Sequence, residues 1–287
     1  MNGDSIFDVK EHLDYRKKRY HKADIENNLL LGLSTVEINP TELCNRVCSF
    51  CPRSNPDVYP NRKLNMSVDT ASALAEQLVD ANFNGDIHIT GYGEPTLNPD
   101  ILKIILAFEE HFFTEMITNG DRLLSGRLKH NELTQHGLNS LIVDCYDGPE
   151  QTEKISKLLE SFTGQKRIRN HYDTGESNLF ELYNYNNRGG AIGQNKTLHR
   201  PCYMPTYKAF IDWNGDVGLC CNDWQRGQKP FGNINESNFS DIWMSKEFER
   251  VRKLLLQGRR YELPACKMCD TDGCKSGGDS ARLWNKI

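Results

Sequence analysis

The chain has 287 residues, of which 38% are hydrophobic, 26% are charged and 9% are aromatic, and its formal net charge is −4. This length allows one large domain or one domain with a small second unit, and the composition favours a packed core over wholesale disorder. The slightly acidic balance argues against a nucleic-acid partner, and the longest apolar run, around Ile101–Phe108, is too short for a membrane span. The charged stretch Met1–Tyr20 shows no signal-peptide pattern, so we expect a cytoplasmic protein.

Predicted strands and helices alternate from Thr35 to about His171. They follow an N-terminal extension that carries a helical pattern over Val9–His21. The predicted strands are Thr35–Asn39, Asp86–Thr90, Thr114–Thr118, Leu141–Cys145 and Arg167–His171. The predicted helices are Ser67–Ala81, Asp100–Phe112, Ser125–His136 and Glu150–Phe162. This alternation predicts βαβ units and a parallel sheet, whose ligand-binding loops follow the carboxyl ends of the strands.

The pattern changes after about Leu198. Ala209–Trp213 and Asp216–Cys220 read as a β-hairpin, and Asn214-Gly215 between them predicts a type I′ turn. A helix is expected over Phe239–Gln257. The Gly- and Cys-rich tail from Cys266 onward has too few apolar residues to pack alone, which indicates that a metal holds it together.

Ten cysteines are unusual for a chain without an export signal, and they favour metal or redox chemistry over disulfides. They form two separated groups with one cysteine between them, which indicates two sites. The first group is Cys44, Cys48 and Cys51; the isolated residue is Cys145; the second group is Cys202, Cys220, Cys221, Cys266, Cys269 and Cys274.

The first group reads Cys44-Asn-Arg-Val-Cys48-Ser-Phe-Cys51. Three thiolates on one short loop can hold three corners of a [4Fe-4S] cluster, which is usually held by four cysteines. The fourth iron would then be open to a small ligand that chelates it through amino and carboxylate groups. The alternatives are a zinc site and three unrelated buried thiols.

This CxxxCxxC segment after a first strand, with Phe50 directly before the third cysteine, resembles the radical S-adenosylmethionine (SAM) superfamily. The resemblance implies that SAM binds the open iron of the cluster held by Cys44, Cys48 and Cys51. It implies that the reduced cluster cleaves SAM to methionine and a 5′-deoxyadenosyl radical, which abstracts hydrogen from a substrate. It also implies an α/β fold, a partial (β/α)6 barrel open on one side.

Two further loops support the resemblance. Gly91-Tyr92-Gly93-Glu94-Pro95 is similar to the Gly-Gly-Glu segment of the superfamily, which implies that Gly93 and Glu94 meet the amino group of SAM. Asn119 and Asp144 end the third and fourth strands, and the resemblance implies contacts with the ribose, the methionine carboxylate or the substrate. Each of these segments is also compatible with an ordinary turn.

Cys145 falls at the predicted barrel rim. A thiol there could donate a hydrogen atom to a substrate radical, as in radical epimerases. The alternative is a small buried residue with no chemical role, which is common for free cysteine.

The second cysteine group resembles the auxiliary-cluster region of the SPASM/Twitch subfamilies. A SPASM domain uses seven cysteines for two clusters, whereas this region has six, so the resemblance implies one auxiliary [4Fe-4S] cluster that moves an electron. The implied ligands are Cys202, Cys220, Cys266 and Cys269. Cys274 or Cys221 could replace one of them, and a zinc ion on the same four thiols is the alternative.

The expected organisation is an extension over residues 1–34, a radical SAM barrel over 35–196 and a small α+β Twitch/SPASM-like iron–sulfur domain over 197–287 that closes the barrel. Arginines and aromatic residues between the two units are candidates for a polar pocket: Arg167, Arg169, His171, Tyr183, Tyr185 and Arg188. Asn187–Gly190 resembles a segment of carbohydrate-associated relatives.

The resemblance is strongest to relatives that dehydrogenate a sugar or aminocyclitol alcohol. The implied substrate is a small molecule, and the implied partner is an electron donor such as flavodoxin or ferredoxin. The alternatives are an epimerase that uses Cys145 or Cys221, a peptide-modifying enzyme, and a non-catalytic iron–sulfur or zinc protein.

Overall fold

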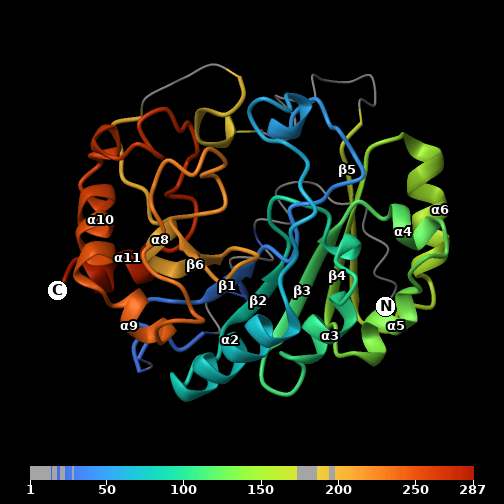
Figure 1. Ribbon diagram of the computed structural model, residues 1–287, viewed down its shortest axis with the longest axis horizontal. Helices are drawn as coiled ribbons and strands as arrows, with labels where there is room; N and C mark the ends of the chain where they lie inside the picture. Colours follow the sequence, from blue (N-terminus) through green and yellow to red (C-terminus); the bar gives the residue numbers. More distant parts are fainter. Residues whose placement is uncertain (1–13, 15–17, 20–22, 28, 173–185, 194–197) are drawn as a thin grey trace.

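The computed structural model describes residues 14, 18–19, 23–27, 29–172, 186–193 and 198–287, and a seven-stranded sheet crosses its centre (Figure 1). The predicted helix over Val9–His21 lies largely outside the described residues. The strands are β1 (Thr35–Ile38), β2 (Asp86–Ile89), β3 (Phe113–Thr118), β4 (Ser140–Cys145), β5 (Gln165–Asn170), β6 (Lys208–Ile211) and β7 (Val217–Gly218).

The sheet has the order β5-β4-β3-β2-β1-β6-β7. All neighbours from β5 to β6 pair in parallel, and β6 and β7 form an antiparallel hairpin. The expected α/β class and open, partial barrel are therefore confirmed. The C-terminal hairpin joins the same sheet, because β6 pairs along the edge of β1 that β2 leaves free.

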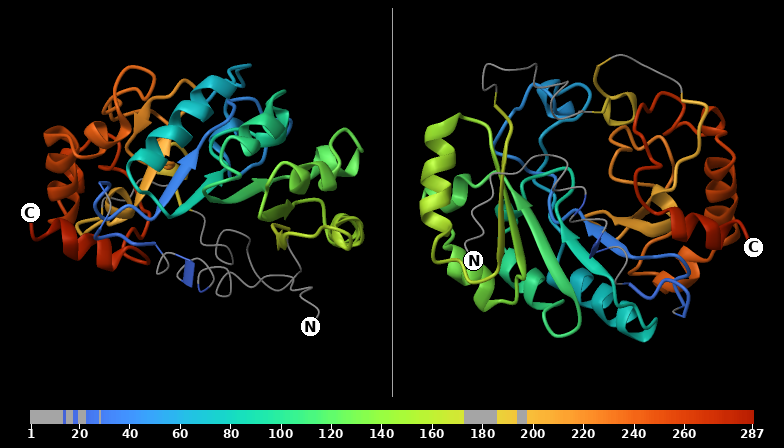
Figure 2. Two further views of the ribbon diagram at one scale, coloured as in Figure 1. Left: turned by 90° about the horizontal axis from the view of Figure 1, so that it is seen from below. Right: turned by 180° about the vertical axis from the view of Figure 1, so that it is seen from behind.

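The helices that follow β1 to β4 lie on one face of the sheet, and the C-terminal segment flanks the β6–β7 end (Figures 1 and 2). The α-helices are α2 (Val68–Asp80), α3 (Ile101–Leu106), α4 (Asp121–Leu124), α5 (His130–Gln135), α6 (Pro149–Leu159), α8 (Met204–Tyr207), α9 (Phe239–Trp243), α10 (Lys246–Leu256) and α11 (Gly278–Trp284). The short 3-10 helices are η1 (Pro52–Ser54), η2 (Pro95–Leu97), η3 (Arg188–Gly190) and η4 (Arg260–Glu262).

Several local predictions are wrong in detail. The helix expected over Asp100–Phe112 ends at Leu106, and the strand expected over Asp216–Cys220 is reduced to β7. The helix expected over Phe239–Gln257 is divided into α9 and α10, because Ser245 caps α10 by accepting a hydrogen bond from Phe248 N (3.3 Å). The helix expected over Ser125–His136 is reduced to α5, since a turn with Gly126 at φ 70° precedes it. The hairpin turn is not type I′, because of Asn214 and Gly215 only Gly215 has a positive φ.

The two faces of the sheet differ in polarity. Val36, Ile38, Ile87 and Val143 belong to the hydrophobic core that the sheet shares with its helices. Since side chains alternate along a strand, the residues between them point to the opposite, inner face. Four of these align across the sheet from β1 to β4 and are buried: Glu37, His88, Glu115 and Ser140. A buried Lys208–Glu37 ion pair adds to this polar inner face, which is not the apolar filling of a closed barrel.

Candidate functional site

The first cysteine loop begins directly after β1, and its three thiols are partly buried. Burial, followed by the charges of Cys51 and Cys44, raises the pKa of Cys48 to about 12. The three thiols are therefore close enough to influence one another. Asn61 holds the start of the loop, since its side chain accepts a hydrogen bond from Cys44 N (2.9 Å) and donates one to Cys44 O (2.8 Å).

Arg53 joins the cysteine loop to the loop after β2. Its guanidinium is 5% exposed and donates to Tyr92 O (2.9 Å), to Asn61 Oδ1 (3.0 Å) and to Glu42 O. Because a guanidinium presents its donors in a fixed plane, one side chain sets the distance between three backbone segments.

The Gly91–Pro95 loop packs against the segment that leads into the cysteines. A Cβ at Gly93 would lie 2.1 Å from Thr41 O, and one at Gly91 would lie 2.5 Å from Asn39 Oδ1. Gly91 also has a φ of 108°, which few other residues adopt. Glycines are therefore required here for a close approach of two backbones, one of which carries the cysteines.

Glu94 is 3% exposed, and both oxygens of its carboxylate accept hydrogen bonds within the protein. It accepts hydrogen bonds from Thr118 Oγ1 (2.6 Å) and Asn119 N (2.8 Å), and from the hydroxyl and the amide of Thr96 (2.7 and 3.1 Å). Burial raises the pKa of Glu94, and these hydrogen bonds oppose the rise. The side chain thus fastens the Gly91–Pro95 loop to the end of β3.

Asp144 lies on the inner side of β4, where Arg169 donates to it twice (2.5 and 2.7 Å) and His171 Nε2 lies 3.1 Å away. Burial acts to raise the pKa of Asp144, but these two neighbours outweigh it and lower the pKa well below its usual range. Phe50 from the cysteine loop stacks beside Tyr146 (5.7 Å between ring centroids) and His171 (6.1 Å).

Asn119 completes this edge of the sheet, because its amide donates to Asn45 Oδ1 in the cysteine loop (2.9 Å). The structure therefore brings the predicted cofactor residues together at the carboxyl ends of β1 to β4. They are Phe50, Gly91, Gly93, Glu94, Pro95, Asn119 and Asp144.

Cys145 has a different setting. It belongs to the hydrophobic core, is 0% exposed and contacts Thr152 of α6. Its alternation with Asp144 turns the thiol toward the helices and away from the inner face. Of the two interpretations that the sequence left open, this position favours a small buried residue over a hydrogen donor.

The second cysteine group is assembled from separate segments. Cys202 precedes α8, Cys220 follows β7, and Cys266 and Cys269 follow η4. Burial, followed by the charges of Cys202 and Cys269, raises the pKa of Cys266. Burial also raises the pKa of Cys220, as do Cys221, Cys266 and Cys269, so these thiols converge.

A buried arginine organises the backbone around the second group. Arg260 is 1% exposed and donates to Arg200 O (3.0 Å), Pro201 O (2.8 Å) and Thr271 O (2.8 Å). Cys274 donates its thiol proton to Pro201 O (3.0 Å), and its charge helps to raise the pKa of Cys202. It therefore lies near this group and remains an alternative ligand.

Within the described ranges, no three His, Cys, Asp or Glu side chains are close enough to hold a single metal ion. Each iron of a cluster takes its own thiolate, so a cluster needs convergent but separated thiols. Three thiols in one loop, and four thiols from converging segments, fit that requirement.

The predicted pocket residues are only partly described, since Tyr183 and Tyr185 lie outside the described residues. The charge of Arg188 opposes the rise in pKa that burial causes at Cys51 and at Cys221, so Arg188 lies near one thiol of each group. Asn187 donates to Met268 O (2.5 Å), which ties the Asn187–Gly190 segment to the second group.

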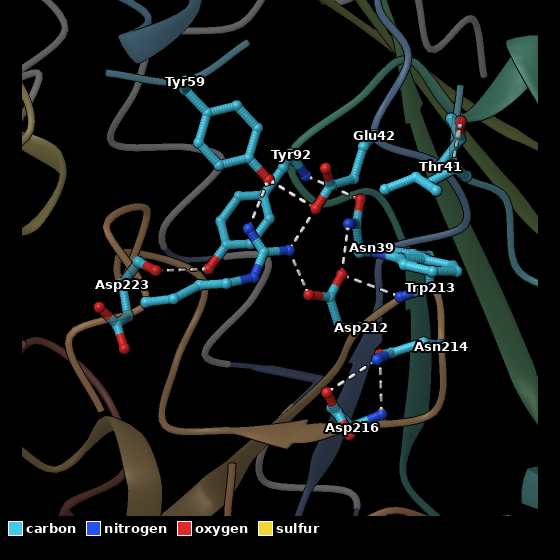
Figure 3. Close-up of polar contacts among 12 residues, drawn as sticks. Asn39, Thr41, Glu42, Tyr59, Tyr92, Asp212, Trp213, Asn214, Asp216 and Asp223 are labelled. Atoms are coloured by element: carbon cyan, nitrogen blue, oxygen red, sulfur yellow. Dashed lines mark hydrogen bonds and ion pairs between the residues drawn. The ribbon is translucent and has the colours of Figure 1, made fainter. Parts of the chain in front are cut away.

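Sequence reasoning missed the contact region between the two cysteine groups (Figure 3). There, the rings of Tyr59, Tyr92, Phe210 and Trp224 form a buried cluster against Cys51 and Cys221. Arg226 crosses the same region to Glu42 and Asp212. These residues come from segments far apart in the chain, so no local spacing could have revealed them.

Comparisons with known proteins agree with this geometry. The family model of the radical SAM superfamily matches residues 38–173, and the model of SPASM, an iron–sulfur cluster-binding domain, matches residues 202–270. The chain therefore belongs to the radical SAM superfamily, and it is an oxidoreductase whose cofactors are SAM, a [4Fe-4S] cluster and auxiliary iron–sulfur centres.

Among its relatives is the S-adenosyl-L-methionine-dependent 2-deoxy-scyllo-inosamine dehydrogenase of Niallia circulans, which is 30% identical over 83% of this chain and 92% of that enzyme. The crystal structure of BtrN in complex with AdoMet and 2-DOIA superimposes with a TM-score of 0.70 and 26% identity, over 85% of this chain and 96% of that one. Histidine-tagged anSMEcpe with bound AdoMet shares the fold (TM-score 0.51, 12% identity, 88% of this chain and 92% of that one). No helix among the described residues is long and apolar enough to cross a membrane.

Proposed function

We propose that this enzyme dehydrogenates a secondary hydroxyl group of an aminocyclitol or a similar polar carbohydrate. The observation that carries the proposal is the similarity to the inosamine dehydrogenase, which extends over 92% of that enzyme. The polar inner face supports it, because buried Glu37, His88 and Glu115 suit a hydroxylated substrate better than an apolar one. Arg188, whose charge acts on a thiol of each cysteine group, would contribute a hydrogen-bond donor to the substrate.

We assign Cys44, Cys48 and Cys51 to the SAM-binding cluster and Cys202, Cys220, Cys266 and Cys269 to one auxiliary cluster. When bound, these groups supply the electron transfer and the radical chemistry that remove a carbon-bound hydrogen. The protein's own residues position that chemistry. Glu94 fastens the loop of Gly91, Gly93 and Pro95 to the end of β3, and this loop would hold the methionine end of SAM. Phe50, Asn119 and Asp144, at the same edge of the sheet, would hold the remainder of the cofactor.

Further parts of the proposal follow from this reaction. We propose that the electron donor is a flavodoxin or a ferredoxin and that the enzyme works in the cytoplasm. Residues 35–196 form the barrel unit and residues 197–287 the auxiliary unit, after an extension over 1–34.

Anaerobic incubation of the reconstituted enzyme with SAM, dithionite and 2-deoxy-scyllo-inosamine tests the proposal. We expect 5′-deoxyadenosine and a ketone in equal amounts, measured by mass spectrometry. Deuterium at the reacting carbon should appear in the 5′-deoxyadenosine. An inverted alcohol would instead identify an epimerase, and 5′-deoxyadenosine without any change in the aminocyclitol would reject this substrate class.

A further inference from the structure

Arg226 lies in the loop that follows Cys220 and Cys221 of the second cysteine group. Its side chain nevertheless reaches the segment that leads into the first group. Its guanidinium donates to the carboxylates of Glu42 and Asp212 and to Tyr59 Oη (3.0 Å). It also lies over the Tyr92 ring, 5.3 Å from the centroid. Figure 3 shows these partners converging from both sides of the contact region.

Glu42 is the partner next to the first cysteine group, two positions before Cys44. It is 1% exposed, and its Oε1 accepts hydrogen bonds from Arg226 and from Tyr59 Oη (3.0 Å). Its other oxygen, Oε2, is buried without a hydrogen-bond partner among the described residues. A buried carboxylate in this state depends on its remaining cation, so Arg226 determines where the Glu42 side chain can lie.

Asp212 extends the same network to the first strand. Its Oδ1 accepts hydrogen bonds from Asn39 Nδ2 (2.7 Å) and Trp213 N (2.9 Å), while Arg226 binds Oδ2. Asn39 in turn accepts a hydrogen bond from Tyr92 N (2.9 Å). One guanidinium therefore touches a network that includes the end of β1, the start of the cysteine loop and the Gly91–Pro95 loop.

The backbone around Arg226 is held in an uncommon conformation. Arg226 has a φ of 48°, which is rare for residues other than glycine. Arg226 N donates to Asp223 O (3.0 Å), and the Asp223 carboxylate accepts from Gly227 N (2.7 Å) and Gln228 N (3.0 Å). A strained conformation that its surroundings fix in this way is typical of functional positions.

We propose that Arg226 is a positioning residue for the SAM site: it fixes the Glu42 end of the first cysteine loop against the auxiliary segment. The SAM site then forms fully only when that segment is folded. This inference rests on the proposed assignment of Cys44, Cys48 and Cys51 to the SAM-binding cluster, but not on the identity of the substrate.

The test compares anaerobically reconstituted wild type with Arg226→Gln and Arg226→Lys. SAM affinity is measured by equilibrium dialysis, and the SAM-induced change in the electron paramagnetic resonance spectrum of the reduced first cluster is recorded. We expect Arg226→Gln to weaken SAM binding by about 10–100-fold, as for other residues that orient metal ligands, with unchanged iron content. Arg226→Lys should recover part of the loss, because lysine keeps the charge but not the planar donors.

Arg250→Gln is the matched control, since Arg250 on α10 forms an exposed pair with Glu247 (2.8 Å). It should bind SAM like the wild type. The double variant Glu42→Gln/Arg226→Gln also removes the buried Glu42 charge, while Asp212 keeps its hydrogen bonds from Asn39 and Trp213 N, so we expect it to fold and still bind SAM weakly. If the double variant binds SAM normally, the defect came from the stranded Glu42 charge and the proposal fails.

Two other results overturn the proposal. One is wild-type SAM affinity and spectral change in Arg226→Gln. The other is a loss of auxiliary-cluster iron in that variant, which would indicate a general structural role. A wild-type protein without any SAM-dependent spectral change would instead contradict the proposed cofactor assignment.

Discussion

The two cysteine groups of this enzyme are built in opposite ways. The first lies in one loop directly after β1, with three partly buried thiols supported from behind by Arg53 and Asn61. The second is drawn from separate segments between residues 202 and 269; Cys266 and Cys269 are buried, and Cys202 and Cys220 are partly buried. Three thiols leave one iron of a [4Fe-4S] cluster open to an external ligand, whereas four thiols complete its coordination.

The difference indicates that the two centres have different roles. The loop arrangement suits a centre at which a cofactor must bind and leave, and the enclosed arrangement suits a centre that only exchanges electrons. Separate losses of the two centres should therefore have separate consequences.

The largest effect is expected for Cys48→Ala. With two thiols left in the loop, the SAM-binding cluster should be lost, and 5′-deoxyadenosine formation should fall to background. Iron content should decrease by about four atoms per chain, while the auxiliary cluster stays. Retention of SAM cleavage in this variant would refute the assignment of the first group.

Cys266→Ala should remove the second centre and leave the first intact. We expect the auxiliary cluster to be lost and ketone formation to stop, while 5′-deoxyadenosine is still produced above background. Parallel assays of both products measure this uncoupling. Ketone formation at the wild-type rate would show that Cys266 has no role in turnover.

Glu94→Gln tests how the loop beside the first centre is held. A glutamine cannot accept all four hydrogen bonds that Glu94 receives, so we expect SAM binding to weaken by about tenfold, measured by isothermal titration. Thr118→Val removes one of the donors and should give a smaller loss. Equal SAM affinity in all three proteins would mean that this loop does not depend on Glu94.

Asp144→Asn should reduce stability in a pH-dependent way. The pKa of Asp144 is lowered in the folded protein, so its contribution is present above the unfolded value, about 4, and is lost as pH falls through the folded value. We expect the free energy of unfolding at pH 7, measured with urea, to fall by about 3 kcal/mol relative to wild type. The difference between the two proteins should become smaller below about pH 4. A pH-independent difference would contradict the ion-pair explanation.

The smallest effect is expected for Cys145→Ala. The thiol packs in the core, so the substitution should cost about 1 kcal/mol and leave the ratio of ketone to 5′-deoxyadenosine unchanged. Thermal unfolding and product analysis test both points. If the enzyme is instead an epimerase that uses this thiol, Cys145→Ala should release 5′-deoxyadenosine without the inverted alcohol that the wild type forms, and that result would restore the hydrogen-donor hypothesis.

The sequence determined the local features of this protein. The first cysteine site could be predicted because Cys44, Cys48 and Cys51 are close together in the chain. The strand–helix alternation could be predicted because it depends on local hydrophobic patterns. For the same reason the Gly91–Pro95 segment could be placed after its strand. The prediction of one long C-terminal helix failed because a single serine, Ser245, begins a new helix there.

Only the tertiary structure decided which residues meet across long separations. The pairing of β6 with β1, the inward or outward direction of Cys145, and the contact of Arg226 with Glu42 depend on how the sheet brings distant segments together. These contacts have no local signature, because their selection depends on burial and on satisfying buried charges after the chain has folded.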